Sequence, residues 1–420
     1  MKRKTLALAL AAAFAAPTVS AQTLDQKIEI LRQEIDGLKA QIRKMPAQGR
    51  PAAAQTPLDY ASPLDHTAGL ASGSTTFVGY GEMNYSKFRE SGDAKADLRR
   101  FVFGFNHRFD DRLTFHSEVE IEHSVASKDD EGEVEIEQAW LNYRVDDSIN
   151  VKGGLFLIPL GILNETHEPP TYYGVERNDV ETRVIPTTWR ELGFGVHGEL
   201  GEGFRYDAGV TTGFNSGKLD DPRVGIRSAH QEGQLADAHD LSVYVALNYR
   251  SPGLLVGGGI FTGNTGQNGQ ANPLLKGVAA RLTLWDLHVK YSIDRLELQA
   301  LYAAGTLGDT DQLNAAVGAT ATPPFAVPKT MKGAYAQAAY HVYKDGKLDV
   351  APFVRLKRLE IEQQEDPANG LFQDPNNLER VTTVGVNFKL HPQVVLKTDV
   401  QRYRTDKSKD RFNIGIGYMF

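Results

Sequence analysis

The sequence predicts an all-β fold: a closed transmembrane β-barrel of about sixteen antiparallel strands, preceded by an N-terminal coiled-coil helix. The first observation is a rhythm. From about Thr75 to the last residue, alternating segments of roughly ten residues are separated by gaps that are alternately very short and long. Outer-membrane barrels have this pattern, because each strand crosses an apolar band in ~9 to 11 tilted residues and short turns at one end alternate with long loops at the other.

Composition is the second observation. The 420-residue chain has a mean hydropathy of −0.36 and no run of 18 apolar residues after its N-terminus. Membrane helices are therefore excluded, whereas a barrel is not, since only every second residue of its strands faces lipid. The formal net charge of −7 gives no excess of positive charge that could bind nucleic acid, so no nucleic-acid partner is expected. The absence of cysteine means that disulfides do not hold the fold.

The N-terminus has the pattern of an exported chain. Lys2, Arg3 and Lys4 precede an apolar run, and small residues lead to Ala21, so residues 1–21 are predicted to be a cleaved signal peptide.

Residues 22–44 are predicted to form a periplasmic coiled-coil helix, because apolar residues recur at intervals of four and three. These residues are Leu24, Ile28, Leu31, Ile35, Leu38 and Ile42. A lone helix of about 30 Å is marginal in water, so the stripe needs a partner, either the same segment of neighbouring subunits or the chain's own barrel. Residues 45–72 are rich in Pro and Ala and suit an extended linker.

The barrel is predicted to occupy residues 73–420. Its expected strands are residues 77–85, 98–109, 113–122, 133–145, 149–157, 189–200, 204–215, 241–250, 254–262, 278–291, 296–304, 333–343, 348–361, 380–390, 394–404 and 411–420. With an even number of strands, the first strand begins and the last strand ends on the periplasmic side. Sixteen strands leave an aqueous interior.

Alternation assigns side chains to the two faces of each strand. In the third strand Leu113, Phe115, Val119 and Ile121 share one side, and His116, Glu118, Glu120 and Glu122 share the other. A Lys or Arg facing lipid at mid-depth costs about 2 to 4 kcal/mol, and an Asp or Glu somewhat less, so the charged side is expected to face inward. The same argument places inward Arg100, Asn106, Arg144, Lys152, Arg281, Arg355, Lys357, Lys397 and Asp399. One bulge would reverse these faces, and Trp285-Asp286 is expected to be such a bulge.

The C-terminal strand is the third observation. Phe412, Ile414, Ile416, Tyr418 and Phe420 alternate with small or polar residues. The final Tyr-Met-Phe resembles the aromatic signal that the barrel assembly machinery recognises, so this machinery, outer-membrane lipid and lipopolysaccharide are the expected partners.

The gap at about 159–188 breaks the rhythm and is predicted to be a constriction loop. A long loop with many specific residues in a compact protein is usually functional. The alternative is a loop packed between subunits or over the barrel mouth. The loop contains Arg177 and Arg183 against five carboxylates, with His167 neutral.

Motifs for chemistry are weak in this sequence. Residues 193–198 match GxGxxG but run into a turn and another strand rather than a helix, so no nucleotide site is expected. The glycines are interpreted instead as small strand positions where a loop or a neighbouring barrel packs closely. The eleven histidines show no metal-site spacing, and no GxSxG supports a hydrolase. No catalytic residue, metal or cofactor is therefore expected.

The chain resembles the phosphate-selective porin O and P superfamily, and its coiled coil with a spacer is similar to that of the DcaP-like porins. The resemblance rests on Gly153 to Gly161, on Glu137-Gln138-Ala139-Trp140 and on the C-terminal strand. It implies a trimeric outer-membrane channel for small anions such as phosphate or dicarboxylates. The long loop has more acidic than basic residues, whereas an anion-selective constriction is lined by positive charge. We therefore do not infer phosphate specificity from the resemblance.

The sequence thus predicts a non-enzymatic porin for small hydrophilic solutes, with mild anion preference. The barrel favours a homotrimer, whereas the Ile and Leu pattern of the coil favours two strands, and we expect the barrel to decide. The candidate pore-lining residues are His167, Arg177, Arg183, Arg190, Arg100, Arg144, Arg281, Arg355, Glu118, Glu120 and Glu122. Two other functions stay open: a barrel that anchors the envelope or acts as an adhesin through its coil, and an outer-membrane hydrolase.

Overall fold

The computed structural model describes residues 71–146 and 148–420. The predicted signal peptide (1–21), the coiled-coil helix (22–44) and all but the last two residues of the predicted linker (45–72) lie outside the described residues. Within the described part of the chain, no helix is both long and apolar enough to cross a membrane.

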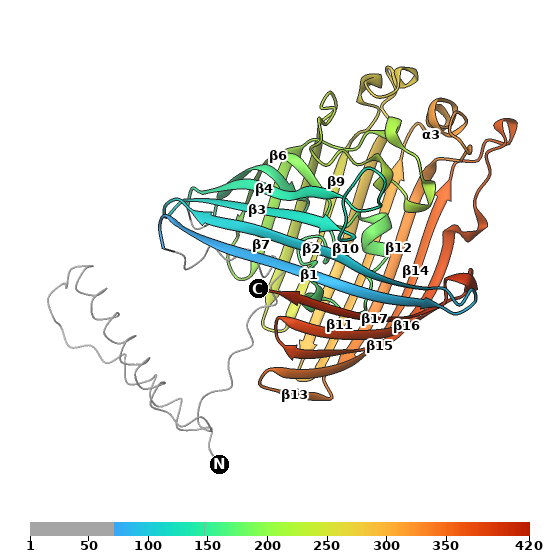
Figure 1. Cartoon of the computed structure of the whole chain (residues 1–420). Coiled ribbons are helices and arrows are strands. Elements are labelled where there is room, and N and C mark those ends of the chain that lie inside the picture. The colour runs from blue at the N-terminus through green and yellow to red at the C-terminus, as the bar shows by residue number, and fades with distance from the viewer. Residues whose placement is uncertain (1–70, 147) are drawn as a thin grey trace, which may run out of the picture. The chain divides into compact units, whose positions relative to one another are not determined.

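The described strands form one antiparallel sheet that closes on itself (Figure 1). Each strand pairs with its neighbours along the chain, and β1 (Ser74–Phe88) also pairs with β17 (Arg411–Met419). The long β12 (Pro328–Tyr340) and the short β13 (Tyr343–Asp345) both pair with β14 (Leu348–Gln363), so the two together make one crossing. The predicted sixteen-stranded antiparallel barrel is therefore confirmed.

The other elements follow in chain order. The remaining strands are β2 (Ala94–Arg108), β3 (Leu113–Glu122), β4 (Val134–Arg144), β5 (Asn150–Leu157), β6 (Arg190–Glu199), β7 (Phe204–Thr211), β8 (Ser242–Ser251), β9 (Leu254–Asn264), β10 (Arg281–Ile293), β11 (Leu296–Leu307), β15 (Leu378–His391) and β16 (Val394–Tyr403). Short helical turns in the loops are η3 (Pro169–Thr171), η4 (Val180–Val184), η5 (Ser216–Lys218), η6 (Pro222–Val224), η7 (Arg227–Ala229), η8 (Gln267–Gly269), η9 (Pro273–Leu275), α3 (Thr310–Leu313), η10 (Asn314–Gly318), η11 (Pro367–Asn369), η12 (Pro375–Asn377) and η13 (Lys407–Lys409).

Every strand expected from alternation overlaps one crossing, and β3 has the predicted bounds. Boundaries differ most where a strand runs into a long loop. The strand predicted at 204–215 ends at Thr211, because Asn215 instead caps η5 by accepting a hydrogen bond from the backbone N–H of Gly217.

Short turns join the strands at the end of the barrel that holds the start of β1 and the end of β17, here called the turn end. Two of these turns use the same device. A carboxylate oxygen of Asp110 accepts the N–H groups of Arg112 and Leu113 at 2.7 and 2.9 Å. Asp146 accepts those of Ser148 and Ile149 at 2.8 and 2.9 Å. An aspartate that mimics a backbone turn in this way fixes the hairpin register.

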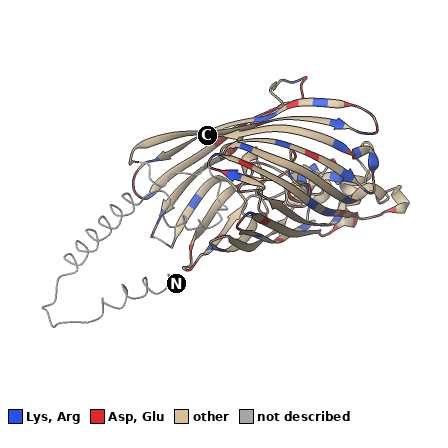
Figure 2. Ribbon diagram, turned by 90° about the horizontal axis from the view of Figure 1, so that it is seen from below, with Lys and Arg blue, Asp and Glu red and all other residues tan. Residues whose placement is uncertain are grey.

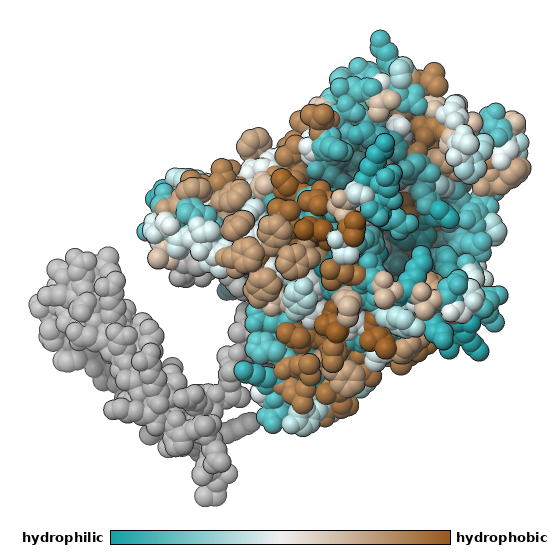
Figure 3. Space-filling model, viewed as in Figure 1, coloured by the Kyte–Doolittle hydropathy of each residue, from teal (hydrophilic) through white to brown (hydrophobic). Residues whose placement is uncertain are grey.

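The loop end, opposite the turn end, carries the longer connections, and the outer surface between the two ends is apolar. Figure 3 shows hydrophobic side chains over the strands and hydrophilic ones gathered at the loop end. In β3 the expected alternation is present, since Glu118 and Glu120 are buried inside while Leu113 and Val119 on the other side are partly exposed.

The structure places Arg281 on the outward side of β10, so the inward position expected from the sequence is wrong. Leu282 and Leu284 are fully buried, whereas Arg281 shares the exposed side with Trp285. Pairing with β9 and β11 continues through Trp285 and Asp286 without a register shift, so the bulge expected there is also wrong. Arg281 begins its strand at the loop end, where a charge does not have to lie at mid-depth in lipid.

One side of the barrel interior is filled by an apolar core rather than by charged residues. Strands β8 to β12 and β14 contribute inward residues such as Leu284 and Met331. The loops contribute Val180, Trp189 and Phe214, each at most 1% exposed. Inward charges are also present elsewhere, as at Asp286 on β10 and Asp399 on β16, but around β1 to β4 they line an open cavity.

Candidate functional site

The connection between β5 and β6, residues 158–189, crosses the interior of the barrel and is called the inner loop. Near its start the N–H of Gly161 donates to the carboxylate of Asp286 on β10 at 3.0 Å. Further along, the N–H of Val175 donates to Asp399 on β16 at 2.7 Å. In the closed strand order β10 and β16 are separated by several strands in both directions, so the loop connects distant parts of the wall.

A buried carboxylate fixes the path of the inner loop. One oxygen of Glu181 accepts the N–H groups of Ile162 and Leu163 at 2.5 and 2.8 Å, and the other accepts the hydroxyl of Tyr335 on β12 at 2.7 Å. Burial raises the pKa of Glu181, although these three hydrogen bonds act in the opposite direction. The loop is thereby attached both to itself and to the wall.

Glycines on the inward face of the wall let the inner loop approach closely. A β carbon at Gly417 would lie 2.2 Å from the Cβ of Pro169, and one at Gly333 would lie 2.7 Å from a methyl carbon of Val180. Both separations are below van der Waals contact, so a larger residue would displace the loop. Glycine in these strands therefore marks the places where the loop packs.

A charged cavity of about 170 Å³ lies between the inner loop, the loop of residues 212–241 and strands β1 to β4. Figure 2 shows basic and acidic residues gathered among the strands and loops of the barrel. The cavity is lined by eight carboxylates, those of Glu82, Glu120, Glu122, Glu133, Glu135, Glu176, Asp179 and Glu232, and by five guanidinium groups, those of Arg99, Arg100, Arg177, Arg190 and Arg227. Acidic groups are thus in excess.

Arg100 is the centre of an acidic cluster on the wall. Its guanidinium lies 2.9 Å from Glu82, 2.9 Å from Glu120 and 3.5 Å from Glu122, and its side chain is 7% exposed. A buried arginine with carboxylates on its donors is held rigidly, because its planar group can satisfy several of them at once. Arg100 therefore compensates part of the acidic wall.

Arg190 connects the wall to the loop of residues 212–241. It lies 2.5 Å from Glu135 on β4 and 3.6 Å from Glu232 on that loop. Burial alone would raise the pKa of Glu232, but the hydrogen bond with His230 and the charge of Arg190 outweigh it and lower the pKa to about 2. Glu232 is therefore ionised at neutral pH and holds this loop against the wall.

Arg177 is the inner-loop arginine that reaches the cavity. It is 8% exposed, and one terminal nitrogen donates to the backbone oxygen of His167 at 3.2 Å. Among the described residues, its Nε and Nη1 have no hydrogen-bond partner. These two nitrogens are buried, so Arg177 contributes its positive charge to the cavity rather than open donors to a solute.

A second hollow leads to the cavity from the loop end. It has a volume of about 840 Å³ and is lined by β1, β2, the loop after β3 and Arg411. Arg99 and Glu176 line both this hollow and the cavity, so the two adjoin. Arg99 is the extra residue of a bulge in β2, because Glu82 pairs with Arg100 and Met83 with Leu98.

The structure brings some of the predicted pore residues together and separates others. Arg100, Arg177, Arg190, Glu120 and Glu122 line the cavity. Glu118 and His167 lie in a buried group described below. Arg183 pairs with Glu379 at 3.0 Å, and Arg355 donates to Gln337 and to the backbone oxygen of Tyr173. Arg144 ends β4 at the turn end and Arg281 begins β10 at the loop end, so neither lies at the cavity.

Several cavity residues were missed by the sequence reasoning. Glu82 and Glu135 alternate inward as Arg100 does, so strand periodicity could have found them. Arg227 and Glu232 come from the loop of residues 212–241, and no local pattern indicates that this loop turns inward. Their position depends on tertiary packing.

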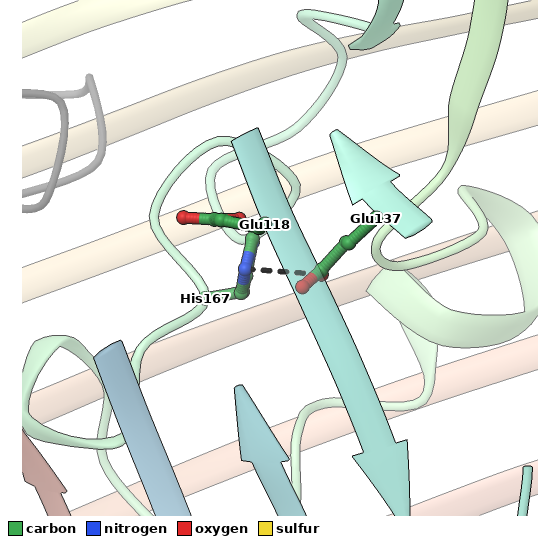
Figure 4. A group of neighbouring side chains, drawn as sticks. All are labelled: Glu118, Glu137 and His167. Carbon is green, nitrogen blue, oxygen red and sulfur yellow. Dashed lines mark ion pairs between the residues drawn. The ribbon is translucent and has the colours of Figure 1, made fainter. Parts of the chain in front are cut away.

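Glu118, Glu137 and His167 form a buried group beside the cavity (Figure 4). Their ligand atoms all lie within 4.8 Å of one another, although the residues come from β3, β4 and the inner loop. Burial, followed by the charge of Arg177, lowers the pKa of His167 well below its usual value. Sequence spacing did not indicate this group, because its members meet only in the folded barrel.

No model of a known protein family matches the chain. An uncharacterized protein of Aquifex aeolicus is 27% identical over 351 residues, which cover 81% of this chain and 79% of that protein. Membership of the phosphate-selective porin superfamily therefore stays a prediction.

Solved structures with a similar fold are outer-membrane barrels. OmpF of Salmonella typhi, in complex with daunomycin, gives a TM-score of 0.55 at 14% identity, covering 83% of this chain and 98% of that one. The outer membrane channel DcaP of Acinetobacter baumannii gives 0.52 at 12% identity, with 83% and 98% covered. An anion-selective porin from Comamonas acidovorans gives 0.50 at 10% identity, with 83% and 99% covered. The chain has a porin-type barrel fold.

Proposed function

We propose that the protein is an outer-membrane porin, a water-filled channel through which small hydrophilic solutes diffuse passively. The observation that carries this proposal is the charged cavity inside a closed barrel whose outer surface is apolar. A channel needs no chemistry of its own, since pore width and lining charge determine which solutes pass. In this orientation the turn end faces the periplasm and the loop end faces outward.

The proteins of similar fold support this proposal. One is described as an outer membrane channel and another as an anion-selective porin. An outer membrane protein of Vibrio cholerae with a similar barrel, TM-score 0.50, has been solved in a trimer form. We therefore propose a homotrimer in the outer membrane, with lipid and lipopolysaccharide around the barrel and Phe420 as the signal for the assembly machinery.

The lining charge favours cations. The sequence suggested mild anion preference from its arginines, but eight carboxylates and five guanidinium groups line the cavity. Selectivity follows the charge at the narrowest accessible point. We accordingly propose a weak preference for cations and zwitterions over anions, which also argues against a phosphate-specific channel.

Liposome swelling tests the proposed function. Liposomes that contain the folded protein are diluted into isotonic solutions of neutral sugars of increasing size. A porin makes them swell with the smallest sugars and progressively less with larger ones, because entry depends on pore width. Liposomes with the heat-unfolded protein are the control. If the folded protein admits none of the sugars, diffusion through the barrel is refuted.

A further inference from the structure

We propose that Glu118, Glu137 and His167 bind one divalent transition-metal cation, with zinc as the representative ion, and that this ion fastens the inner loop to the barrel wall. The inference goes beyond the proposed channel and does not depend on conduction. Glu118 lies on β3 and Glu137 on β4, whereas His167 belongs to the inner loop, so one ion would join three segments.

The geometry fits a small cation. Zinc binds imidazole nitrogen at about 2.0 to 2.1 Å and carboxylate oxygen at about 2.0 to 2.2 Å, which puts tetrahedral ligand atoms roughly 3.3 Å apart. The three ligand atoms lie within 4.8 Å of one another. Side-chain rotations that move the ligand atoms by about an ångström bring them to the separation expected around zinc. One histidine and two carboxylates form a ligand set for zinc or a similar divalent metal.

The hydrogen bonding of His167 leaves the lone pair of its Nε2 directed toward Glu137. Its Nδ1 lies 2.9 Å from the backbone oxygen of Asn164, and since a carbonyl oxygen only accepts, Nδ1 carries the hydrogen. In the neutral ring Nε2 is then an acceptor. It lies 3.2 Å from a carboxylate oxygen of Glu137, makes no hydrogen bond with any residue that the structure describes, and belongs to a side chain that is 0% exposed. Two facing acceptors need a cation or a proton between them.

The surroundings orient the proposed ligands. The hydroxyl of Tyr80 donates to Glu137 at 3.1 Å, and the amide of Gln138 donates to Glu118 at 2.7 Å. With the bond from His167 to Asn164, each proposed ligand thus has an outer hydrogen-bond partner, as is usual around protein-bound metals. Glu137 is also the extra residue of a bulge in β4, since Glu118 pairs with Gln138 and Val119 with Ile136. A bulge re-aims a side chain, here into the group.

Charge balance also favours a cation. Glu118 and Glu137 are 5% and 0% exposed, and two adjacent buried carboxylates repel each other unless a cation or a proton lies between them. The positive charge of Arg177 lies near this group, since its guanidinium donates to the backbone oxygen of His167. The same guanidinium also faces the carboxylates that line the cavity. A divalent ion neutralises both ligand carboxylates while the histidine stays neutral. The competing arrangement is a single proton shared by Glu137 and His167.

Zinc binding to the refolded full chain tests the proposal. Because the three side chains are buried, the protein is refolded with zinc or with EDTA, dialysed against zinc buffers, and its bound zinc is counted per chain. The expected result is one zinc per chain in the wild type, with affinity at least about tenfold lower in Glu137→Gln and in His167→Asn. Glu133→Gln is the matched control, because Glu133 lines the cavity but lies outside the group, and it should bind like the wild type. No bound zinc, or equal binding by all variants, would overturn the site.

A second measurement uses the wild type alone, in case the variants do not fold. X-ray absorption at the zinc edge of the loaded protein should show a shell of one nitrogen and two carboxylate oxygens at about 2.0 to 2.2 Å, completed by water. A shell without nitrogen would mean that zinc is held elsewhere and would refute the proposal. The swelling assay is independent, so failure of the metal site and failure of the channel are distinguishable.

Discussion

At the scale of single residues, buried charges hold the loops inside the barrel. Arg190 is 2% exposed and lies between Glu135 of the wall and Glu232 of a loop. Glu135 and Glu232 are 21% and 39% exposed, so water replaces part of the lost attraction, and removing Arg190 costs less than breaking a fully buried pair.

Arg190→Ala is therefore expected to lower the free energy of unfolding by about 1 to 3 kcal/mol, measured by urea unfolding of the barrel in detergent. The matched control is Arg223→Ala, whose side chain is 70% exposed and pairs with Asp221 at 2.9 Å. Exposed pairs contribute about 0 to 1 kcal/mol, so the control should unfold nearly like the wild type. Equal losses in both variants would contradict the role given to Arg190.

The ion pair of Asp179 with Lys357 makes the attachment of the inner loop sensitive to acid. Burial would raise the pKa of Asp179, but the charge of Lys357 outweighs it and lowers the pKa to about 2. The unfolded value is about 3.9, so the stabilisation is complete above about pH 4 and is lost as the pH falls through about 2.

The melting temperature of the wild type should therefore fall between about pH 4 and pH 2 more steeply than that of Asp179→Asn, which has no carboxyl to protonate. Thermal unfolding at a series of pH values measures this difference. Asp129→Asn, on the exposed loop after β3, serves as the control and should follow the wild type. Parallel curves for the wild type and Asp179→Asn would rule out the proposed linkage.

The lining carboxylates should determine ion preference. Replacing Glu122 and Glu232 together by lysine reverses two charges at the cavity and should shift the reversal potential under a KCl gradient toward anions. Asp129→Lys together with Asp220→Lys reverses two charges on exposed loops away from the cavity and should leave the potential near that of the wild type. If both variants shift it equally, selectivity is a property of total charge and not of the cavity.

At the scale of elements, the strands could be predicted and the inner packing could not. Alternation is a local pattern, so it identified β3 with its bounds and the inward side of Glu118 and Glu120. The placement of Arg281 failed because the first inward positions of β10 are Leu282 and Leu284, which pack against loops that no local pattern locates. The charged cavity was partly anticipated through Arg100 and Arg177, but its residues from the loop of 212–241 were not.

Gly417→Val tests the packing of the inner loop on β17. Its side chain would meet Pro169, and because the proline ring cannot rotate away, the loop must move. The expected cost is about 1 to 3 kcal/mol, measured by urea unfolding, together with altered sugar permeability. Gly308→Val is the control, since a β carbon there finds its nearest neighbour at 3.5 Å. Unchanged stability and permeability in Gly417→Val would show that the contact with Pro169 is unimportant.

At the scale of the whole molecule, the barrel interior has two sides, one with an apolar core and one with a charged cavity. Loops and wall form an apolar core on the side of β8 to β12 and β14, and the charged cavity lies near β1 to β4. A sixteen-stranded barrel is wide enough for an aqueous channel. The loops narrow that width to a cavity of about 170 Å³, which adjoins a larger hollow at the loop end.

Single-channel recording in a planar lipid bilayer tests this account most directly. The folded wild-type protein is added to one side of the bilayer in concentrated KCl, with the heat-unfolded protein as the control. A porin produces discrete, repeated steps of current that grow in proportion to voltage, because ions pass through the charged cavity without a binding cycle. Protein that inserts in folded form and carries no current would contradict the central claim.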